Sequence, residues 1–263
     1  MTLMPPVPFK STLNRVVAGA LIFGSVMAMS MSFASAQAIE TSAREAFIMD
    51  FDTGAVLLDK EGDTLTEPAS MTKMMTVHML FKYIKDGRVS MDDTFHVSEK
   101  AWRKGGSKMF VEVNSNVSVS HLLHGIIVQS GNDAAIVVAE GIGGSEEAFA
   151  EAMTEEARAI GMTKSVFKNA TGWPADGHLV TVHDLAILAR DTIRSFPDLY
   201  ELYSVKEFTY NGIRQPNRNP LLGTSAGVDG LKTGHTEAAG YGLTASAERD
   251  GRRLILVVNG LDS

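Results

Sequence analysis

The sequence predicts an α+β fold in which an antiparallel sheet is built from both ends of the chain and flanked by helices, with a mainly helical subdomain. Two short apolar runs surround a Gly-containing turn at residues 46–58, which is typical of a β-hairpin. Two more runs, at 242–248 and 253–258, flank Asp250-Gly251, a dipeptide suited to a tight hairpin turn. Helical periodicity dominates between these ends. Because strands and helices do not alternate strictly, we expect an antiparallel sheet.

The first 36 residues have the features of a secretory signal peptide. Lys10 and Arg15 precede an apolar stretch at residues 16–28, and Ala34-Ser35-Ala36 is a small-residue cleavage site. The stretch is shorter than the ~20 apolar residues that span a bilayer. We therefore expect an exported protein whose folded domain occupies residues 37–263.

The first helix follows Pro68, where Met74, Val77, Phe81 and Ile84 fall on one stripe. Residues 169–177 are rich in turn-forming residues and are predicted to be a loop. Further helices are predicted at 122–127, 133–140, 145–160 and from 181 onward.

Two of these helices carry polar side chains whose roles can be predicted. Thr181 and Asp184 form a capping-box pattern, in which Thr181 accepts from a first-turn amide and Asp184 reaches back. The helix at 145–160 carries a charged face whose simplest role is solvation. That face consists of Glu146, Glu147, Glu151, Glu155 and Glu156.

Composition excludes several classes of function. The net charge of −7 includes no basic run, so no nucleic-acid partner is expected. The chain has no cysteine, which excludes disulfides, catalytic thiols and thiolate metal sites. His121 and His124 lie one helical turn apart, but no third ligand at suitable spacing accompanies them. We expect neither a metal nor a cofactor.

Three short motifs occur in a fixed order. The first, Ser70-Met71-Thr72-Lys73, places a hydroxyl and an ammonium on one helix face that continues into apolar residues. Burial there lowers the pKa of Lys73, which would allow a neutral amine to accept the serine proton. Alone, this motif is more often a helix cap with a solvated lysine.

The second and third motifs are also weak when taken singly. Ser130-Gly131-Asn132 lies between two apolar helical segments, where a hydroxyl and a carboxamide can enter a cleft. Residues 230–234 read Gly-Leu-Lys-Thr-Gly, with a lysine and threonine that can hold a carboxylate on an edge strand. Together and in this order, the three motifs are specific to penicillin-binding proteins and β-lactamases.

Beyond the motifs, the chain resembles the low-molecular-mass penicillin-binding proteins, specifically the D-alanyl-D-alanine carboxypeptidases. The resemblance covers nearly everything after residue 40 and implies a β-lactamase/transpeptidase-like fold. It includes Glu-Pro-Ala-Ser-Met-Thr-Lys-Met at 67–74, Ser-Gly-Asn-Asp-Ala at 130–134, Asn-Gly-Ile-Arg-Gln at 211–215 and the segment 228–236.

The resemblance implies a role for each motif residue. Ser70 would be the nucleophile, Lys73 its general base, and Ser130 the hydroxyl that relays a proton to the leaving D-alanine. The remaining residues would bind substrate. Asn132 would bind its amide, Gly234 would let its backbone lie close to the strand, and Lys232, Thr233 and Arg218 would bind its terminal carboxylate. The backbone N–H groups of His235 and Ser70 would stabilise the oxyanion. Lys232 must stay charged, so we expect it to line an open cleft.

The expected substrate is a peptidoglycan stem peptide ending in D-Ala-D-Ala, with β-lactam antibiotics as covalent inhibitors. The expected place is the periplasm, at the outer face of the cytoplasmic membrane. Members of this family normally continue with another helix, a small β-rich domain and a C-terminal amphipathic anchor. The chain is therefore expected to be cut short at its C-terminus, and membrane association would use a region that it lacks.

Three alternatives remain open. A D,D-endopeptidase would cut cross-links by the same chemistry. A class A β-lactamase would need a Glu-x-x-Leu-Asn loop, which does not occur between Ser130 and Lys232, and has Ser-Asp-Asn where this chain has Ser-Gly-Asn. An inactive penicillin-binding module would not need Ser70, Lys73, Ser130 and Lys232 to be intact.

Overall fold

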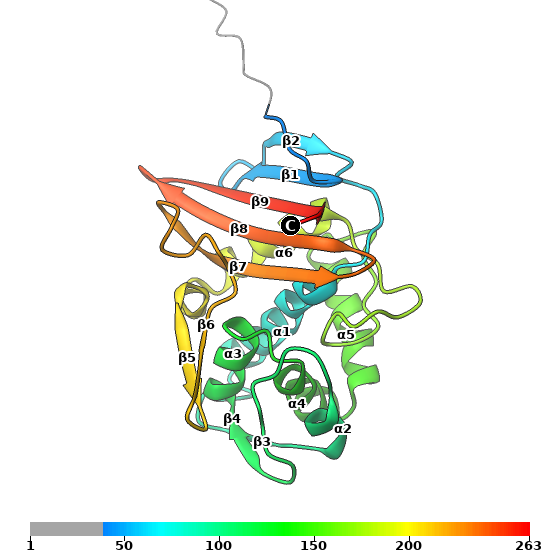
Figure 1. Cartoon of the computed structure of the whole chain (residues 1–263), viewed down its shortest axis with the longest axis vertical. Helices are drawn as coiled ribbons and strands as arrows, with labels where there is room; N and C mark the ends of the chain where they lie inside the picture. The colour runs from blue at the N-terminus through cyan, green and yellow to red at the C-terminus, as the bar shows by residue number, and fades with distance from the viewer. Residues whose placement is uncertain (1–38) are drawn as a thin grey trace, which may run out of the picture. The chain divides into compact units, whose positions relative to one another are not determined.

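The computed structural model describes residues 39–263, so the signal-peptide prediction lies outside the described residues. The N-terminal hairpin consists of β1 (Glu45–Asp50) and β2 (Val56–Lys60). The C-terminal segment forms β7 (Val228–Thr236), β8 (Gly240–Arg249) and β9 (Arg252–Leu261). All five strands join one antiparallel sheet in the order β2-β1-β9-β8-β7 (Figure 1). The prediction of a sheet built from both chain ends is confirmed.

The turn residues explain why the C-terminal strands form a hairpin. Asp250 and Gly251 both have positive φ angles, of 50° and 74°, as a two-residue hairpin turn of this hand requires. The turn sets the register of β8 against β9, and β9 then pairs along its other side with β1. This leaves β7 as an edge strand, whose outer backbone groups are available to a ligand.

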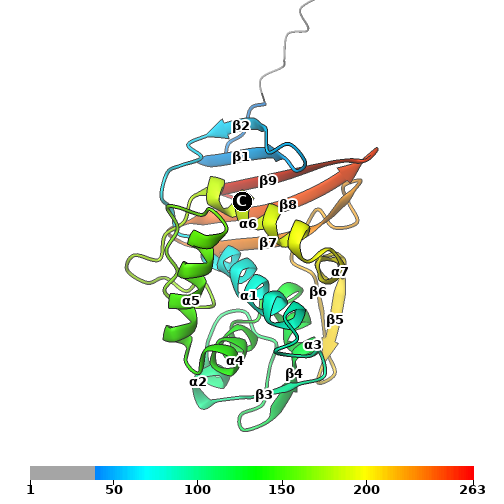
Figure 2. The same cartoon turned by 180° about the vertical axis from the view of Figure 1, so that it is seen from behind.

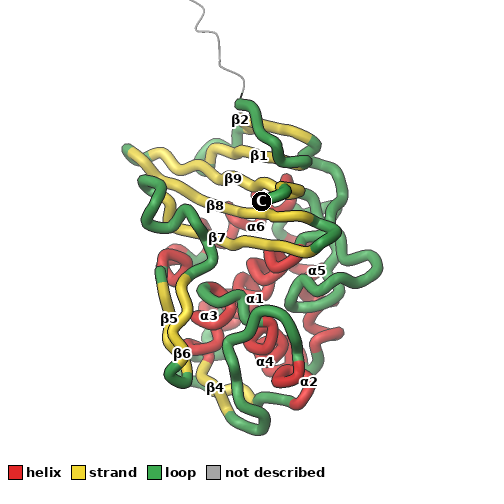
Figure 3. Tube along the Cα trace, viewed as in Figure 1, coloured by secondary structure: helices red, strands yellow, loops and turns green. Residues whose placement is uncertain are grey.

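Helices lie on one face of the sheet and beyond its β7 edge (Figures 1 and 2). The helix α6 (Val182–Ser195) packs on β1 and β9, whereas α1 (Lys73–Lys85) runs between the sheet and the helical subdomain. That subdomain contains α2 (Glu99–Arg103), α3 (Val119–Ile127), α4 (Asn132–Gly143) and α5 (Glu146–Ala159) (Figure 3).

Short elements connect these parts. A 3₁₀ helix, η1 (Ala69–Thr72), leads directly into α1, and α7 (Pro197–Tyr200) is followed by η2 (Glu201–Ser204). Two small hairpins lie at the edge of the helical region. They are β3 (Thr94–His96) with β4 (Asn116–Ser118), and β5 (Glu207–Tyr210) with β6 (Ile213–Pro216).

The apolar stripe predicted for the first helix forms part of the core. Met74, Val77 and Phe81 are buried, while Ile84 is partly buried at the helix end. The helix packs against α3, α4, α5 and α6 at once, which explains why almost its whole first two turns are inaccessible to solvent. Burial of this helix also encloses the polar residue at its start, Lys73.

The capping box predicted at Thr181 is only half correct. The Thr181 hydroxyl accepts from the Asp184 amide at 3.0 Å, but the Asp184 carboxylate does not reach back. It accepts instead from the Lys164 and Ser165 amides and the Ser165 hydroxyl, at 2.7–3.0 Å. Three donors outcompete one, so Asp184 anchors the preceding loop.

Solvation alone is also wrong for three of the five glutamates, including the exposed Glu147, which accepts from Lys100 at 2.9 Å. Glu146 is buried, accepts from the Ala170 amide at 3.2 Å and pairs with Lys100 at 3.0 Å. Glu156 binds Lys82, and hydrogen bonds from His78 and Lys82 lower the pKa of its carboxyl to about 2. Glu146 and Glu156 therefore tie α5 to neighbouring elements.

Within residues 39–263, no helix has the length and apolar character required to cross a bilayer.

Candidate active site

Ser70 and Lys73 meet as the first motif predicts. Ser70 lies in η1, and Lys73 is the first residue of α1. The Lys73 Nζ lies 3.0 Å from Ser70 Oγ and donates to the Thr171 carbonyl at 2.6 Å. Lys73 is 0% exposed. The amine is therefore held against the hydroxyl by a carbonyl from a distant loop.

The surroundings of Lys73 disfavour its charged form. Burial is the largest cause that lowers the pKa of Lys73 well below its usual value, and the positive charge of Lys232 adds to it. The Asp133 carboxylate opposes these effects. An amine with a lowered pKa beside a hydroxyl is the arrangement that activates a serine nucleophile.

The second motif lies at the junction between α3 and α4. Ser130 has a φ of +60°, unusual for a residue with a side chain, and is 2% exposed. Its Oγ has no hydrogen-bond partner among residues 39–263. Asn132 donates through Nδ2 to the Gly105 carbonyl at 2.8 Å. An uncommon backbone conformation and an unpaired hydroxyl are features of functional sites.

The third motif lies on the edge strand β7, opposite η1. A Cβ atom at Gly234 would lie 3.0 Å from the Pro68 carbonyl and 3.2 Å from the Ala69 Cβ. Glycine at this position therefore allows the strand to approach the segment that carries Ser70. Thr233 and His235 line the same cavity as Ser70 and Ser130.

The prediction that Lys232 lines an open cleft is wrong. Lys232 is 2% exposed, and its Nζ donates to the Thr233 carbonyl at 3.1 Å. Burial, with Arg218 as a second cause, lowers its pKa to about 7. Strand alternation explains the difference, because Thr233 and His235 point to the cleft while Lys232 points inward. Its side chain lies behind the cavity wall.

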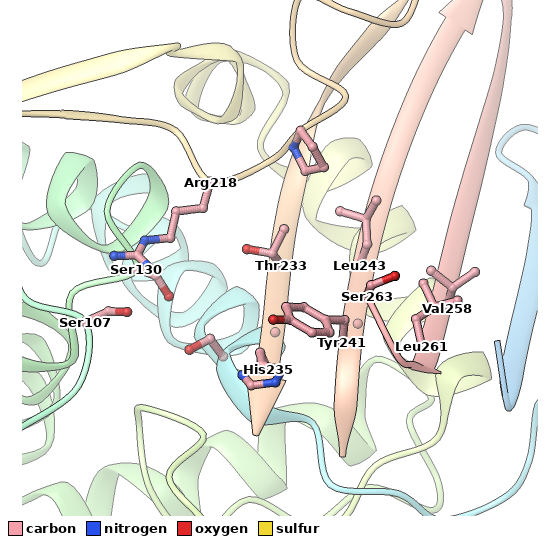
Figure 4. A pocket seen from close by; sticks show the side chains of 14 residues that line it. Ser107, Ser130, Arg218, Thr233, His235, Tyr241, Leu243, Val258, Leu261 and Ser263 are labelled. Atoms are coloured by element: carbon pink, nitrogen blue, oxygen red, sulfur yellow. The ribbon is translucent and has the colours of Figure 1, made fainter. Parts of the chain in front are cut away.

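Two cavities meet at Ser70 and share Ser107 and His235. The first, which we call the Arg218 lobe, has a volume of about 590 Å³ and is also lined by Ser130, Arg218 and Thr233. Figure 4 shows Arg218 extending across this lobe toward Ser130, with Thr233 on the strand opposite. Its exposed guanidinium is the accessible cation for an anionic ligand.

The second cavity, which we call the Trp173 lobe, has a volume of about 620 Å³. Its lining includes Glu67, Asn132, Thr171, Trp173 and Glu237. The two lobes thus divide the motif residues, with Ser130 and Thr233 in one and Asn132 in the other. Ser70 lies where they join.

Sequence reasoning missed several lining residues. Ser107 contributes to both lobes, although only the Gly105-Gly106 pair before it signals a special backbone. Trp173 lies in the segment that the sequence predicts to be a loop, and Glu67 flanks the first motif. Tyr241 stacks near His235, with ring centroids 4.1 Å apart. None of these follows from a spacing pattern.

The histidine pair weighed as a metal site lies outside the cleft. The His124 ring stacks on Phe208 at 4.9 Å between centroids, and His121 lies 5.8 Å from the same ring. Across residues 39–263, no three His, Asp or Glu side chains gather in a way that could hold a metal ion. His78 is a hydrogen-bonded core residue, since its Nδ1 lies 2.9 Å from Thr192 Oγ1.

Comparisons with known proteins agree with this geometry. The family model for D-alanyl-D-alanine carboxypeptidases matches residues 31–263. The D-alanyl-D-alanine carboxypeptidase DacC of Escherichia coli is 40% identical over 239 residues, which cover 87% of this chain and 60% of DacC. The chain thus spans about three fifths of that relative's length.

Solved structures of this kind have the same fold. Penicillin binding protein 5 from Haemophilus influenzae superposes with a TM-score of 0.84 at 39% identity, over 86% of this chain and 67% of that one. The D-alanyl-D-alanine carboxypeptidase DacD from Francisella tularensis gives a TM-score of 0.84 at 37% identity over the same shares. The predicted fold is therefore confirmed, and the chain belongs to the D-alanyl-D-alanine carboxypeptidase family.

Proposed function

We propose that the protein is a serine D-alanyl-D-alanine carboxypeptidase. It removes the terminal D-alanine from stem pentapeptides of peptidoglycan through an acyl intermediate on Ser70. The observation that carries this proposal is the contact between the half-buried Ser70 and the buried Lys73, with Lys73 Nζ 3.0 Å from Ser70 Oγ. A lysine held in this way has a lowered pKa, which suits it to accept a proton near neutral pH.

Acylation would begin when Ser70 Oγ attacks the carbonyl carbon of the penultimate D-alanine and its proton passes to Lys73. The carbonyl oxygen becomes an oxyanion, which the backbone N–H groups of Ser70 and His235 would stabilise. The C–N bond then breaks, and the leaving amine takes a proton from Lys73 through Ser130. An ester on Ser70 and free D-alanine result.

Deacylation would reverse these proton transfers. A water molecule attacks the ester carbonyl, its proton passes to Lys73, and Ser70 regains a proton as the shortened peptide leaves. No further acid or base is needed, because the same amine serves both halves of the reaction. The Ser130 hydroxyl has no partner within the described part of the chain and lines the lobe that would hold the leaving group, which suits it to the relay.

The cleft offers partners for the terminal carboxylate of the proposed substrate. Arg218 and Thr233 line one lobe beside Ser70, and Lys232 lies behind its wall. A terminal carboxylate placed there would meet a planar guanidinium and a hydroxyl, which suit carboxylate geometry. Asn132, at the start of the other lobe, would hold the substrate amide. β-Lactams, which also carry a carboxylate, would acylate the same serine.

Ser70→Ala tests the assignment directly. The variant should release no D-alanine from a pentapeptide ending in D-Ala-D-Ala and should not be labelled by a fluorescent penicillin, because the acyl intermediate needs that oxygen. An unchanged melting temperature would show that the variant is folded. Labelling of the variant at the wild-type level would contradict the proposal. Faster cleavage of cross-linked dimers than of the pentapeptide would favour an endopeptidase.

We further propose that the protein acts outside the cytoplasm, in the periplasm at the outer face of the membrane. Lys10, Arg15, the apolar stretch that follows and Ala34-Ser35-Ala36 support export and cleavage of the leader. N-terminal sequencing of the cellular protein should give a start near Gln37. A cellular protein that retains Met1 and fractionates with the cytoplasm would contradict this.

A further inference from the structure

We propose that Asn217 and Asn219 are positioning residues for the substrate carboxylate, because they hold Arg218 at the corner of a turn that faces Thr233. The inference rests on the proposed function, in which the C-terminal carboxylate of the substrate binds in the Arg218 lobe. Neither asparagine is among the described residues that line the two cleft lobes. Each therefore acts on the carboxylate through Arg218 and β7 rather than by contact with it.

Arg218 depends on its backbone to meet a carboxylate. Its side chain is exposed and forms no ion pair within residues 39–263. Figure 4 shows the guanidinium extending toward Ser130, with Thr233 on the strand opposite. A long side chain of this kind has many rotamers, so the place and direction of its Cα–Cβ bond decide what the guanidinium can reach. The backbone at Arg218 must therefore be fixed relative to Thr233.

Asn217 fixes the backbone on both sides of Arg218. Its Oδ1 accepts from the Asn219 amide at 2.9 Å, so an Asx turn encloses Arg218. Its Nδ2 donates to the Val205 carbonyl at 2.9 Å, and its backbone amide donates to the Lys206 carbonyl at 2.7 Å. These bonds anchor the turn to the segment between η2 and β5 and place Arg218 at its corner.

Asn219 joins the same turn to the edge strand. It is 4% exposed, and its Oδ1 accepts from the Leu221 amide at 3.0 Å, which makes a second Asx turn. Its Nδ2 donates to the Gly230 carbonyl at 2.9 Å. Gly230 belongs to β7 and lies three residues before Thr233. The bond therefore sets the separation between the Arg218 corner and the strand that carries Thr233.

Both positions use two properties that asparagine combines. Each side chain accepts from an amide two residues ahead and donates to a carbonyl outside the loop. Aspartate accepts the same bond but has no N–H to donate, and alanine does neither. A carboxylate that bridges a guanidinium and a hydroxyl needs both at hydrogen-bond distance. Loss of either anchor should therefore weaken capture of the carboxylate.

The test compares two substrates that place the same acyl group on Ser70 of the mature protein. One is an N-acylated peptide that ends in D-Ala-D-Ala. The other is the p-nitrophenyl ester of the same peptide shortened by one D-alanine, whose leaving group carries no carboxylate. Wild type should release D-alanine from the first and p-nitrophenol from the second. If wild type releases no D-alanine, the proposed function itself is overturned.

Asn219→Ala should lower kcat/KM for the peptide about tenfold, mainly through a higher KM, and change kcat/KM for the ester less than about twofold. Asn217→Ala should act in the same way, and Asn217→Asp, which keeps the turn acceptor, should recover part of the loss. Asn116→Ala, which removes an exposed asparagine from β4, should leave both rates unchanged. The melting temperature of each variant shows whether it is folded.

Combination with Arg218→Ala shows whether Asn217 acts through Arg218. The double variant should lose no more kcat/KM for the peptide than Arg218→Ala alone, because the turn then has no guanidinium to place. Equal losses for peptide and ester, an additive loss in the double variant, or an unchanged KM for the peptide would overturn the inference and leave the proposed function intact. If Asn219→Ala does not fold, Asn217→Ala and its double variant decide the question.

Discussion

Each of the two walls of the cleft contains a buried lysine and a loop, but the two lysines differ in their hydrogen-bond partners. The helical wall contains Lys73 and the loop 169–174, and the sheet wall contains Lys232 and the loop 217–221. Both lysines are buried, and both have lowered pKa values. The Lys73 Nζ has two hydrogen-bond partners, the Ser70 hydroxyl and the Thr171 carbonyl. Among residues 39–263, Lys232 Nζ donates only to the carbonyl of the next residue, Thr233.

Lys73 therefore has its partners in place before substrate binds, whereas Lys232 would gain its main partner from the substrate. Protein contacts alone place the Lys73 amine beside the Ser70 hydroxyl, as the general-base role proposed for it requires. Burial, with the positive charge of Arg218 as a second cause, lowers the pKa of Lys232 to about 7. A bound carboxylate would raise the pKa of Lys232 and favour its ammonium form. The positive charges of Lys232 and Arg218 would therefore be neutralised by the carboxylate of the ligand.

Asparagine side chains stabilise the loop on each wall. Asn169 Oδ1 accepts from the Thr171, Gly172 and Trp173 amides at 2.8–3.1 Å. On the other wall, Asn219 Nδ2 donates to the Gly230 carbonyl at 2.9 Å, and Asn217 Nδ2 donates to the Val205 carbonyl at 2.9 Å. Asn169 thus folds its loop on itself, whereas Asn217 and Asn219 bond within their loop and also tie it to neighbouring segments.

Replacing each lysine by arginine tests the comparison with the largest expected effect. Lys73→Arg should lower the second-order rate of acylation by a fluorescent penicillin about 10³-fold, because a guanidinium does not deprotonate near neutral pH. Lys232→Arg should lower it about tenfold, since it keeps a cation near the carboxylate. If Lys73→Arg is the milder variant, the general-base role of Lys73 is wrong.

Gly172→Ala should break the helical wall. A Cβ at Gly172 would lie 1.7 Å from the Ala69 carbonyl oxygen, and φ is +79°. Steric displacement and backbone strain together should lower the free energy of unfolding by about 4 kcal/mol and misplace the carbonyl that binds Lys73. Urea unfolding measures the stability, and the penicillin assay measures the function.

Gly212→Ala is the matched control for backbone strain. Gly212 has a φ of +74°, but a Cβ there would meet nothing within 4 Å. It should cost about 1 kcal/mol, the strain alone. Equal losses in the two variants would show that the approach of the loop to η1 does not contribute to stability.

Lys232→Met should change the free energy of unfolding by an amount that depends on pH. The pKa of Lys232 is about 7 in the folded protein against an ordinary value of 10.5. Between these values the unfolded state binds more protons, so this residue makes stability rise with pH across that window. The variant should be more stable than wild type at pH 7, on the order of 4 kcal/mol, and the gap should close toward pH 10.

Guanidinium unfolding at pH 7, 8, 9 and 10 measures that gap. Lys206→Met, which replaces an exposed lysine just before β5, should change stability little at any of these pH values. A constant difference between Lys232→Met and wild type across the range would contradict titration of Lys232 in this window.

Local patterns were sufficient for several parts of the fold and site. The i,i+3 spacing of Ser70 and Lys73 on an apolar helix face predicts both their contact and the burial of the amine. Turn residues such as Asp250-Gly251 predict the C-terminal hairpin. These predictions succeed because each depends on a few consecutive residues and on a fixed helical or extended period.

The amino-acid sequence by itself determined the α+β class, the positions of the hairpins and the contact between Ser70 and Lys73. Only the tertiary structure decided that Lys232 is buried, that Asp184 anchors a loop, and that Glu67, Ser107 and Trp173 meet around Ser70. The physical reason is that the last three residues come from segments distant in the chain. Their proximity results from packing η1, the α2–β4 segment and the 169–174 loop against one edge strand, and no periodicity along the chain records it.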